Sequence, residues 1–105
     1  MATLTSDITQ GTLTGSGTQD TIATADVGSA QETWSVLFRN YSGSSRTLTL
    51  YVNGTASQNI IAVVTLDASG GFTALDISVG ASDFLKAEAS AGSAVAWTCT
   101  KGILT

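Results

Sequence analysis

The segment from Arg46 to Gly54, with the sequence RTLTLYVNG, carries the clearest structural pattern in the chain. Apolar and polar residues alternate along it, with Leu48, Leu50 and Val52 on one face and Thr47, Thr49 and Tyr51 on the other. A period of two residues is typical of a β-strand that buries one face. The Asn-Gly pair that follows is a strong turn signal. The segment therefore predicts a half-buried strand that ends in a turn.

The same alternation recurs on both sides of this segment. The apolar faces are Trp34, Val36 and Phe38, then Leu75, Ile77 and Val79, then Leu85, Ala87 and Ala89, and last Val95, Trp97 and Cys99. The run Ile60–Leu66 is almost wholly apolar, so we expect it to be buried on both faces. Turn residues separate the segments about every 8–12 residues. The pattern predicts an all-β fold, an antiparallel β-sandwich or jelly-roll-like domain of about six to eight strands.

The first part of the chain has a different character. Residues 1–19 are rich in Thr and Ser and are interrupted by Gly11, Gly15 and Gly17. We expect an extended N-terminal arm over residues 1–19, with one short strand at most, and the β-sandwich domain over residues 20–105, with a floppy tail as the alternative for the first segment. Such an arm can add a strand to the sheet edge of a neighbour, which makes Leu4 and Ile8 candidate interface residues.

Length and charge narrow the classes of partner. A chain of 105 residues fits one domain, and its net charge is −4 with only four basic residues. Nucleic acids and anionic membranes are bound through clustered Lys and Arg, so we expect neither as a partner. The opening MATLTSDITQ lacks a basic start followed by an apolar run, so we expect synthesis in the cytoplasm without a signal peptide.

The residues needed for common active sites are missing. The chain has no His and a single Cys, which excludes Ser-His and Cys-His pairs and the usual zinc sites. A pair of carboxylates is the remaining enzymatic option. The candidates for it are Asp26, Glu32, Asp67, Asp76, Asp83 and Glu88. Most of them fall in turns or on outer faces, so we expect a binding protein with no catalytic residues, no metal and no cofactor.

The aromatic residues divide into two groups. Trp34 and Trp97 fall on apolar strand faces, which predicts core packing. If they were exposed instead, they would form a platform for a carbohydrate. Tyr41, Tyr51 and Phe72 fall at turns or on outer faces, and exposed aromatic side chains are enriched at interfaces. We therefore predict these three as candidate interface residues.

Two stretches resemble small structural proteins of tailed bacteriophages. In Val36–Asn40 an apolar strand ends in Asn, a Ser/Gly turn follows, and Arg46–Val52 has the R-T-hydrophobic-T-hydrophobic-Y pattern of those proteins. The stretch Val79–Ser90 resembles their G-x-x-D-hydrophobic-hydrophobic-x-A-x-A-S hairpin. The resemblance covers about residues 21–104. The chain departs from the pattern at residues 24–29, which contain no Pro where the family has a Pro-Ala-Gly type of turn.

The resemblance implies a β-sandwich of the capsid decoration (cement) or head-fibre-base type. Its expected function is to bind and stabilise the outside of a phage capsid, as a homotrimer that contacts the major capsid protein or another virion protein. The expected location is the capsid surface of the virion. A tail or fibre-associated structural protein is the first alternative. A carbohydrate-binding module is an alternative from another class.

Overall fold

The computed structural model describes residues 4–104, apart from the side chain of Leu4. Within this range the chain forms eight strands and one short 3-10 helix. The elements are β1 (Leu4–Thr12), β2 (Asp20–Thr24), β3 (Gln31–Asn40), β4 (Arg46–Val52), η1 (Ser57–Asn59), β5 (Ile60–Leu66), β6 (Phe72–Val79), β7 (Phe84–Ala89) and β8 (Val95–Leu104). The strand at Arg46–Val52 has the bounds that its alternating pattern predicts.

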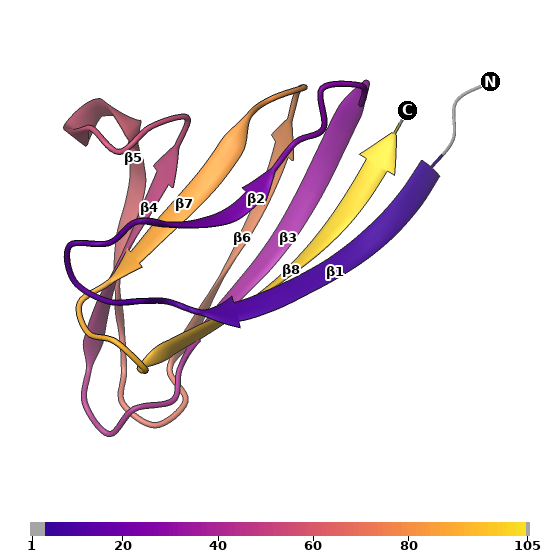
Figure 1. Cartoon of the computed structure of the whole chain (residues 1–105). Helices are drawn as coiled ribbons and strands as arrows, with labels where there is room; N and C mark the ends of the chain where they lie inside the picture. Colours follow the sequence, from indigo (N-terminus) through magenta and orange to yellow (C-terminus); the bar gives the residue numbers. More distant parts are fainter. Residues whose placement is uncertain (1–3, 105) are drawn as a thin grey trace.

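The strands form two antiparallel sheets that face each other (Figure 1). Sheet A has the order β1-β8-β3-β6, and sheet B has the order β2-β7-β4-β5. The first strand thus pairs with the last, the second with the seventh, the third with the sixth, and the fourth with the fifth. This order results when one long hairpin, folded at the β4–β5 turn, is wound up, and it is the arrangement of a jelly roll. The predicted all-β sandwich is confirmed, with eight strands.

The core lies between the inner faces of the two sheets. Sheet A contributes Trp34, Val36, Phe38, Val95 and Cys99, and sheet B contributes Leu48, Leu50, Leu85, Ala87 and Ala89, all of them buried. Every second residue of β3 is buried along its whole length, as expected for a strand with one solvent-facing side. The inward positions predicted for β3, β4, β7 and β8 are confirmed, although Val52 and Trp97 are only partly buried.

The structure places the N-terminal segment differently from the predicted arm. Residues 4–12 form strand β1, which pairs with β8 in a regular register from Leu4–Leu104 to Thr12–Ala96. Leu13, the next residue, is buried in the core. The sandwich therefore begins at the start of the described residues rather than at residue 20. Gly11 has a packing role within this strand. It lies under the Trp97 ring, where a side chain would collide, so the strand needs a glycine at this position.

The expectation for Ile60–Leu66 was wrong. Strand β5 forms an edge of sheet B, and its outward side chains are exposed, with Val63 63 % accessible to solvent. Only Leu66 is buried, while Ala62 and Val64 are partly buried against the core. A continuous apolar run does not reveal how many of its faces are covered, because both faces read as apolar in sequence.

Asn40 fixes the loops at one end of the sandwich. Its buried side-chain amide donates to the backbone oxygens of Ser44 at 2.8 Å, Asp67 at 3.0 Å and Leu66 at 3.2 Å. Its Oδ1 accepts hydrogen bonds from the backbone N–H and the hydroxyl of Ser42. One side chain thereby holds both the β3–β4 loop and the β5–β6 loop. These loops lead into Tyr41 and Phe72, so Asn40 also positions two of the predicted interface residues.

Candidate interaction surface

Sheet A has the longer strands of the two sheets, with eight to ten residues each, and its outer face is the candidate interaction surface. On this face Leu37 of β3 lies between Ala74 of β6 and Thr98 of β8. In the next row Ser35 lies between Asp76 and Thr100. The cross-strand partners of an antiparallel sheet point to the same side, so all six side chains face away from the core. The result is a face of small side chains around a single leucine.

This face is hollowed along its length. A shallow depression of about 310 Å³ is lined by Ser35, Val36, Leu37, Ala74, Asp76, Thr98 and Thr100. Two further depressions lie beside β1 and β8 and beside Gly102, toward the two ends of the same face. Small side chains explain the hollows, because neighbours such as Ala, Ser and Thr fill little space above the sheet. A partner with projecting side chains can therefore pack closely here.

Two opposite charges lie on this face. Arg39 of β3 lies opposite Phe72 of β6, and Asp76 lies two rows further along β6. The Ser35 hydroxyl donates to Asp76 Oδ1 at 2.6 Å, which holds the carboxylate on the face. The face is otherwise made of Thr, Ser, Ala, Gly and Gln with a few apolar side chains. Ordering such a surface costs little side-chain entropy, because few long flexible side chains are immobilised.

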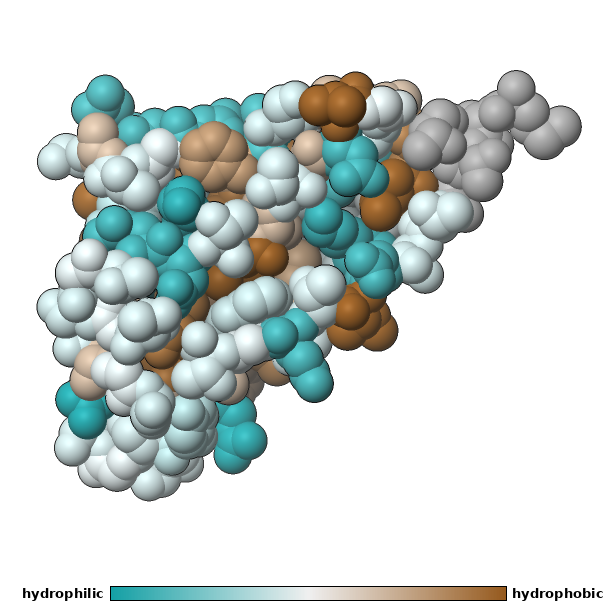
Figure 2. Space-filling view, viewed as in Figure 1, coloured by the Kyte–Doolittle hydropathy of each residue, from teal (hydrophilic) through white to brown (hydrophobic). Residues whose placement is uncertain are grey.

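Three of the predicted interface residues are exposed. Phe72 and Ile8 have 69 % and 66 % of their surfaces accessible, and Tyr41 is also exposed. Ile8 lies opposite Thr100, so it belongs to the outer face of sheet A, as Phe72 does. Leu4 begins β1, but its side chain lies outside the described part of the structure. Figure 2 shows brown apolar patches between white and teal residues on the side that carries β1.

Tyr51 is a correction to the predicted interface. It lies on the outer face of sheet B, as its place in the pattern implies, but only 7 % of its surface is accessible. Its hydroxyl donates to Glu88 at 3.0 Å, and Glu88 also accepts hydrogen bonds from Gly17 N–H and the Gln19 amide, each at 2.8 Å. Burial and the neighbouring Glu88 carboxylate raise the pKa of Tyr51. The segment between β1 and β2 crosses this face and covers the ring.

The interaction surface includes residues beyond the predicted interface residues. Leu37 and Arg39 lie on the outer face of β3, and Ala74 and Asp76 on that of β6. The signal available in the sequence was an apolar residue, Leu37, at a position where the alternation places polar side chains. The pairing of β3 with both β6 and β8 was not visible in the sequence, so these residues could not be assembled into one face.

Neither tryptophan forms an exposed platform. Trp34 is fully buried, and its indole N–H donates to Glu32 at 2.9 Å. The half-buried ring of Trp97 lies against Gly11, where an added Cβ would be 2.9 Å from ring atom Cζ2. Carbohydrate platforms need an open aromatic face, and both rings here pack against their own chain.

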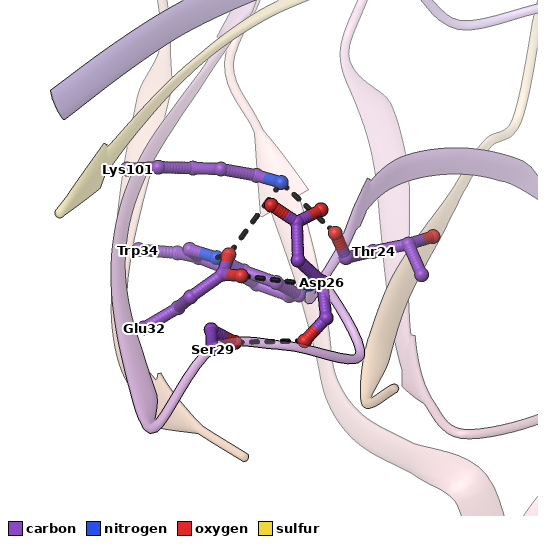
Figure 3. A network of polar contacts seen from close by, with 6 residues as sticks. All are labelled: Thr24, Asp26, Ser29, Glu32, Trp34 and Lys101. Carbon is purple, nitrogen blue, oxygen red and sulfur yellow. Dashed lines mark hydrogen bonds and ion pairs between the residues drawn. The ribbon is translucent and has the colours of Figure 1, made fainter. Parts of the chain in front are cut away.

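A buried polar network closes the end of the sandwich at which β3 begins (Figure 3). The fully buried Glu32 carboxylate accepts hydrogen bonds from Trp34 Nε1 and, at 2.7 Å, from the backbone N–H of Asp26. Lys101 Nζ lies 3.6 Å from Glu32 Oε1 and donates to the Thr24 carbonyl at 2.9 Å. The network therefore ties β3 and β8 to the loop between β2 and β3.

The charged form of Glu32 is the stable one. Burial raises its pKa, but the hydrogen bonds from Trp34 and Asp26 and the charge of Lys101 outweigh burial, so the pKa lies below its ordinary value. The carboxylate is sealed from solvent and has donors on both oxygens. We interpret it as a group that holds the fold.

The other acidic candidates are spread over the molecule. Asp83 accepts hydrogen bonds from Asn53 and Gly80 N–H at the β6–β7 turn, and Glu88 holds the segment that passes over part of the outer face of sheet B. Within residues 4–104, no group of three or more His, Cys, Asp or Glu side chains is arranged to hold a metal ion. In the same part of the chain, no helix has the length and apolarity to cross a membrane.

A scan against protein-family models and a search of curated proteins found no match for the chain. Among solved structures, the fold is similar to that of a chain described with the words "Bacillus endospore appendages form a novel family of disulfide-linked pili". The TM-score is 0.61 at 13 % sequence identity, over 100 % of this chain and 90 % of the other. At this identity the likeness shows the fold alone.

Proposed function

We propose that this chain is a structural virion protein that binds the outside of a phage capsid and stabilises it, as a decoration protein. The observation that carries the proposal is the outer face of sheet A, a broad, shallowly hollowed surface of small side chains with Leu37, Phe72 and Ile8 exposed on it. The phage part of the proposal rests on the sequence resemblance. One of its two motifs forms the end of β3 and strand β4, and the other forms the end of β6 and strand β7.

The architecture suits a protein that acts by contact rather than by catalysis. Buried polar side chains within the described residues all have hydrogen-bond partners, and the strands are braced at both ends by Asn40 and Glu32. A pre-ordered subunit loses little conformational freedom when it docks, so more of its contact energy stabilises the particle. The proposed partners are the major capsid protein and further copies of this chain in a homotrimer.

Binding to capsids that lack this protein tests the proposal. The purified protein should sediment with such capsids, saturate at many copies per particle and raise the temperature at which the shells break. Leu37→Asp, which places a charge in the middle of the face, should reduce binding by about tenfold or more. Thr65→Asp on the exposed outer side of β5 is the matched control and should bind normally. Wild-type protein that stays in the supernatant would contradict the proposal.

A subunit of another protein polymer is the second candidate, and the similar pilus protein favours it. The disulfide linkage in that protein's description has no counterpart here, because the single cysteine, Cys99, is buried in the core. A tail or fibre-associated protein is a further structural alternative. Copy number in purified particles distinguishes them, because a decoration protein should approach the copy number of the capsid protein.

A carbohydrate-binding module is the alternative from another class. It has little support from the packed positions of Trp34 and Trp97. Quenching of tryptophan fluorescence by iodide would test it directly. Strong quenching that a glycan suppresses would favour this alternative over the structural role.

A further inference from the structure

Within residues 4–104, sheet A has two edges with no further strand beside them, and both edges are long and regular. Strand β1 forms one edge with nine residues, and β6 forms the other with eight. Each pairs with its one neighbour without a register shift. A regular edge strand presents a row of backbone N–H and C=O groups that can pair with another chain.

The register shows which groups of β1 point outward. Leu13 N–H donates to the Val95 carbonyl at 2.9 Å, which extends the β1–β8 ladder by one hydrogen-bonded pair. Hydrogen-bonded and non-hydrogen-bonded pairs alternate in an antiparallel ladder, so odd-numbered residues of β1 bond to β8. The N–H and C=O groups of Ser6, Ile8 and Gln10 therefore point away from the sheet.

The outward groups of β6 follow from the same alternation. Asn40 N–H donates to the Gly71 carbonyl at 2.8 Å, just beyond the Arg39–Phe72 pair. The alternation then leaves the backbone groups of Phe72, Ala74 and Asp76 pointing away from β3. The side chains of these residues lie on the outer face of sheet A, and so do those of Ser6, Ile8 and Gln10.

The two edges are complementary in direction. All pairings in sheet A are antiparallel and the sheet has four strands, so β1 and β6 run in opposite directions. When one copy is placed beside another in the same orientation, β1 of one meets β6 of the next in an antiparallel arrangement. The outward backbone groups of both strands then face each other with side chains on matching faces, as one continuous sheet requires.

Sheet B lacks this match. Its edge strand β2 has only five residues and a register shift between Thr21 and Ala23, and its other edge, β5, has a shift where Leu50 and Tyr51 pair with it. Short strands and bulges are common protections of a sheet edge. The edges of sheet A have neither device, and they contain no Lys and no Pro.

The seam would also cover apolar surface. Ile8 on β1 and Phe72 on β6 are the two most exposed large apolar side chains that lie in the strands of sheet A. They lie at opposite edges on the same face, so they approach each other only between neighbouring copies. Placing Ile8 opposite Ala74 brings it diagonal to Phe72, within reach of a large aromatic ring.

We propose that β1 of one copy pairs with β6 of the next, so that copies of this chain join head to tail through a continuous sheet A. The inference rests on the proposed structural role and names the contact that builds its oligomer, but it does not require a capsid. A head-to-tail contact forms a closed ring if the rotations between successive copies add up to one full turn. A ring of three copies is the homotrimer that the proposed capsid role predicts.

Proline variants test the contact, because proline removes one outward N–H and leaves the ladder within the sheet intact. Ile8→Pro blocks the β1 edge, and Ala74→Pro blocks the β6 edge. In analytical ultracentrifugation the wild-type protein should be oligomeric, and each variant should be a monomer with an unchanged β-type circular dichroism spectrum. Ile8→Thr, which keeps the N–H, is the matched control and should retain the oligomer with weaker association.

Mixing the two variants gives a sharper result. The Ile8→Pro copy keeps its β6 edge and the Ala74→Pro copy keeps its β1 edge, so an equal mixture should form a dimer and nothing larger. A symmetric β1–β1 contact would instead leave Ala74→Pro dimeric by itself. A monomeric wild-type protein, or a mixture that stays monomeric, would overturn the head-to-tail contact.

Amide exchange provides the second measurement in case a proline variant unfolds. In the wild-type oligomer the N–H groups of Ser6, Ile8 and Gln10 should exchange at least about tenfold more slowly than in dilute monomer. Equal exchange rates would overturn the proposal. An oligomer with this protection that fails to bind capsids would refute the capsid role and leave the edge contact standing.

Discussion

The two ends of β3 are each closed by a buried polar side chain, and the two side chains work differently. At the end of the strand, the neutral Asn40 amide bonds to backbone groups of two loops. At the start, the Glu32 carboxylate depends on Trp34, the Asp26 N–H and the Lys101 charge. Both positions point inward in the alternation of β3, where the residues between them are the apolar Trp34, Val36 and Phe38.

The comparison shows two ways to satisfy a polar group in a core. An amide donates and accepts at once, so Asn40 is satisfied by backbone groups and the Ser42 hydroxyl, none of which carries a charge. A carboxylate only accepts and carries a charge, so Glu32 needs several donors and a cation nearby. The contribution of Asn40 to stability should therefore be independent of pH, whereas the contribution of Glu32 should depend on pH.

Asn40→Ala should have the largest effect. It leaves the backbone groups of Ser42, Ser44, Leu66 and Asp67 without their partner, and we expect the free energy of unfolding to fall by about 3–5 kcal/mol. Urea denaturation measures the change. Ser42→Ala, which removes one hydroxyl from the same cluster, is the control and should cost about 1 kcal/mol. A loss below about 1 kcal/mol for Asn40→Ala would show that water replaces the amide.

Glu32→Gln should have a smaller effect, a loss of about 1–3 kcal/mol at neutral pH. The amide oxygen of Gln can still accept the hydrogen bond from Trp34. The attraction to Lys101 is lost, however, and the Asp26 N–H then faces the side-chain NH2 group, which is not an acceptor. Chemical denaturation at pH 7 provides the measurement. A variant as stable as the wild type would mean that the free-energy cost of burying the carboxylate equals the stabilisation that its ion pair provides.

Acid should weaken the wild-type protein through this same group. The pKa of Glu32 is lowered in the folded protein, so its stabilising contribution is present above the unfolded value near 4.5 and is lost as pH falls through the folded pKa. The stability gap between wild type and Glu32→Gln should therefore shrink below pH 4.5. Denaturation series at several pH values test this, and Asn40→Ala should show no such change in its gap.

The smallest expected effect is the coupling between the two ends. Residues 32 and 40 are roughly 26 Å apart along an extended strand and share no partner. A double-mutant cycle with Glu32→Gln and Asn40→Ala should give an interaction energy below about 0.5 kcal/mol. A larger coupling would mean that β3 transmits strain from one end to the other.

The strands that bury one face could be predicted from sequence. In Arg46–Val52 and Gln31–Asn40 the apolar side chains recur at every second position, and this period is a property of the local backbone. The same pattern correctly placed Trp34, Leu50 and Cys99 inside. Turn residues such as Asn53, which adopts a φ of 59°, marked where strands end.

The errors in the candidate surface have a common cause. The two-residue period places Tyr51 on the correct face, but the segment that includes Gly17 and Gln19 passes over that part of the face. The residues of strand β1 alternate only weakly, so their pattern predicts an arm, and most of the strand is exposed on both faces. In both cases a contact between distant parts of the chain decided the outcome, and local periodicity does not contain such contacts.

By itself, the sequence determined that the protein is all-β, because the two-residue period and the turn residues are local properties that each segment carries alone. Tertiary structure alone decided that β1 belongs to a sheet, that Asn40 and Glu32 close the ends of β3, and that sheet A presents two unprotected edges. The reason is that pairing joins residues far apart in the chain, such as β1 with β8, and only the folded arrangement specifies which edges and faces remain free.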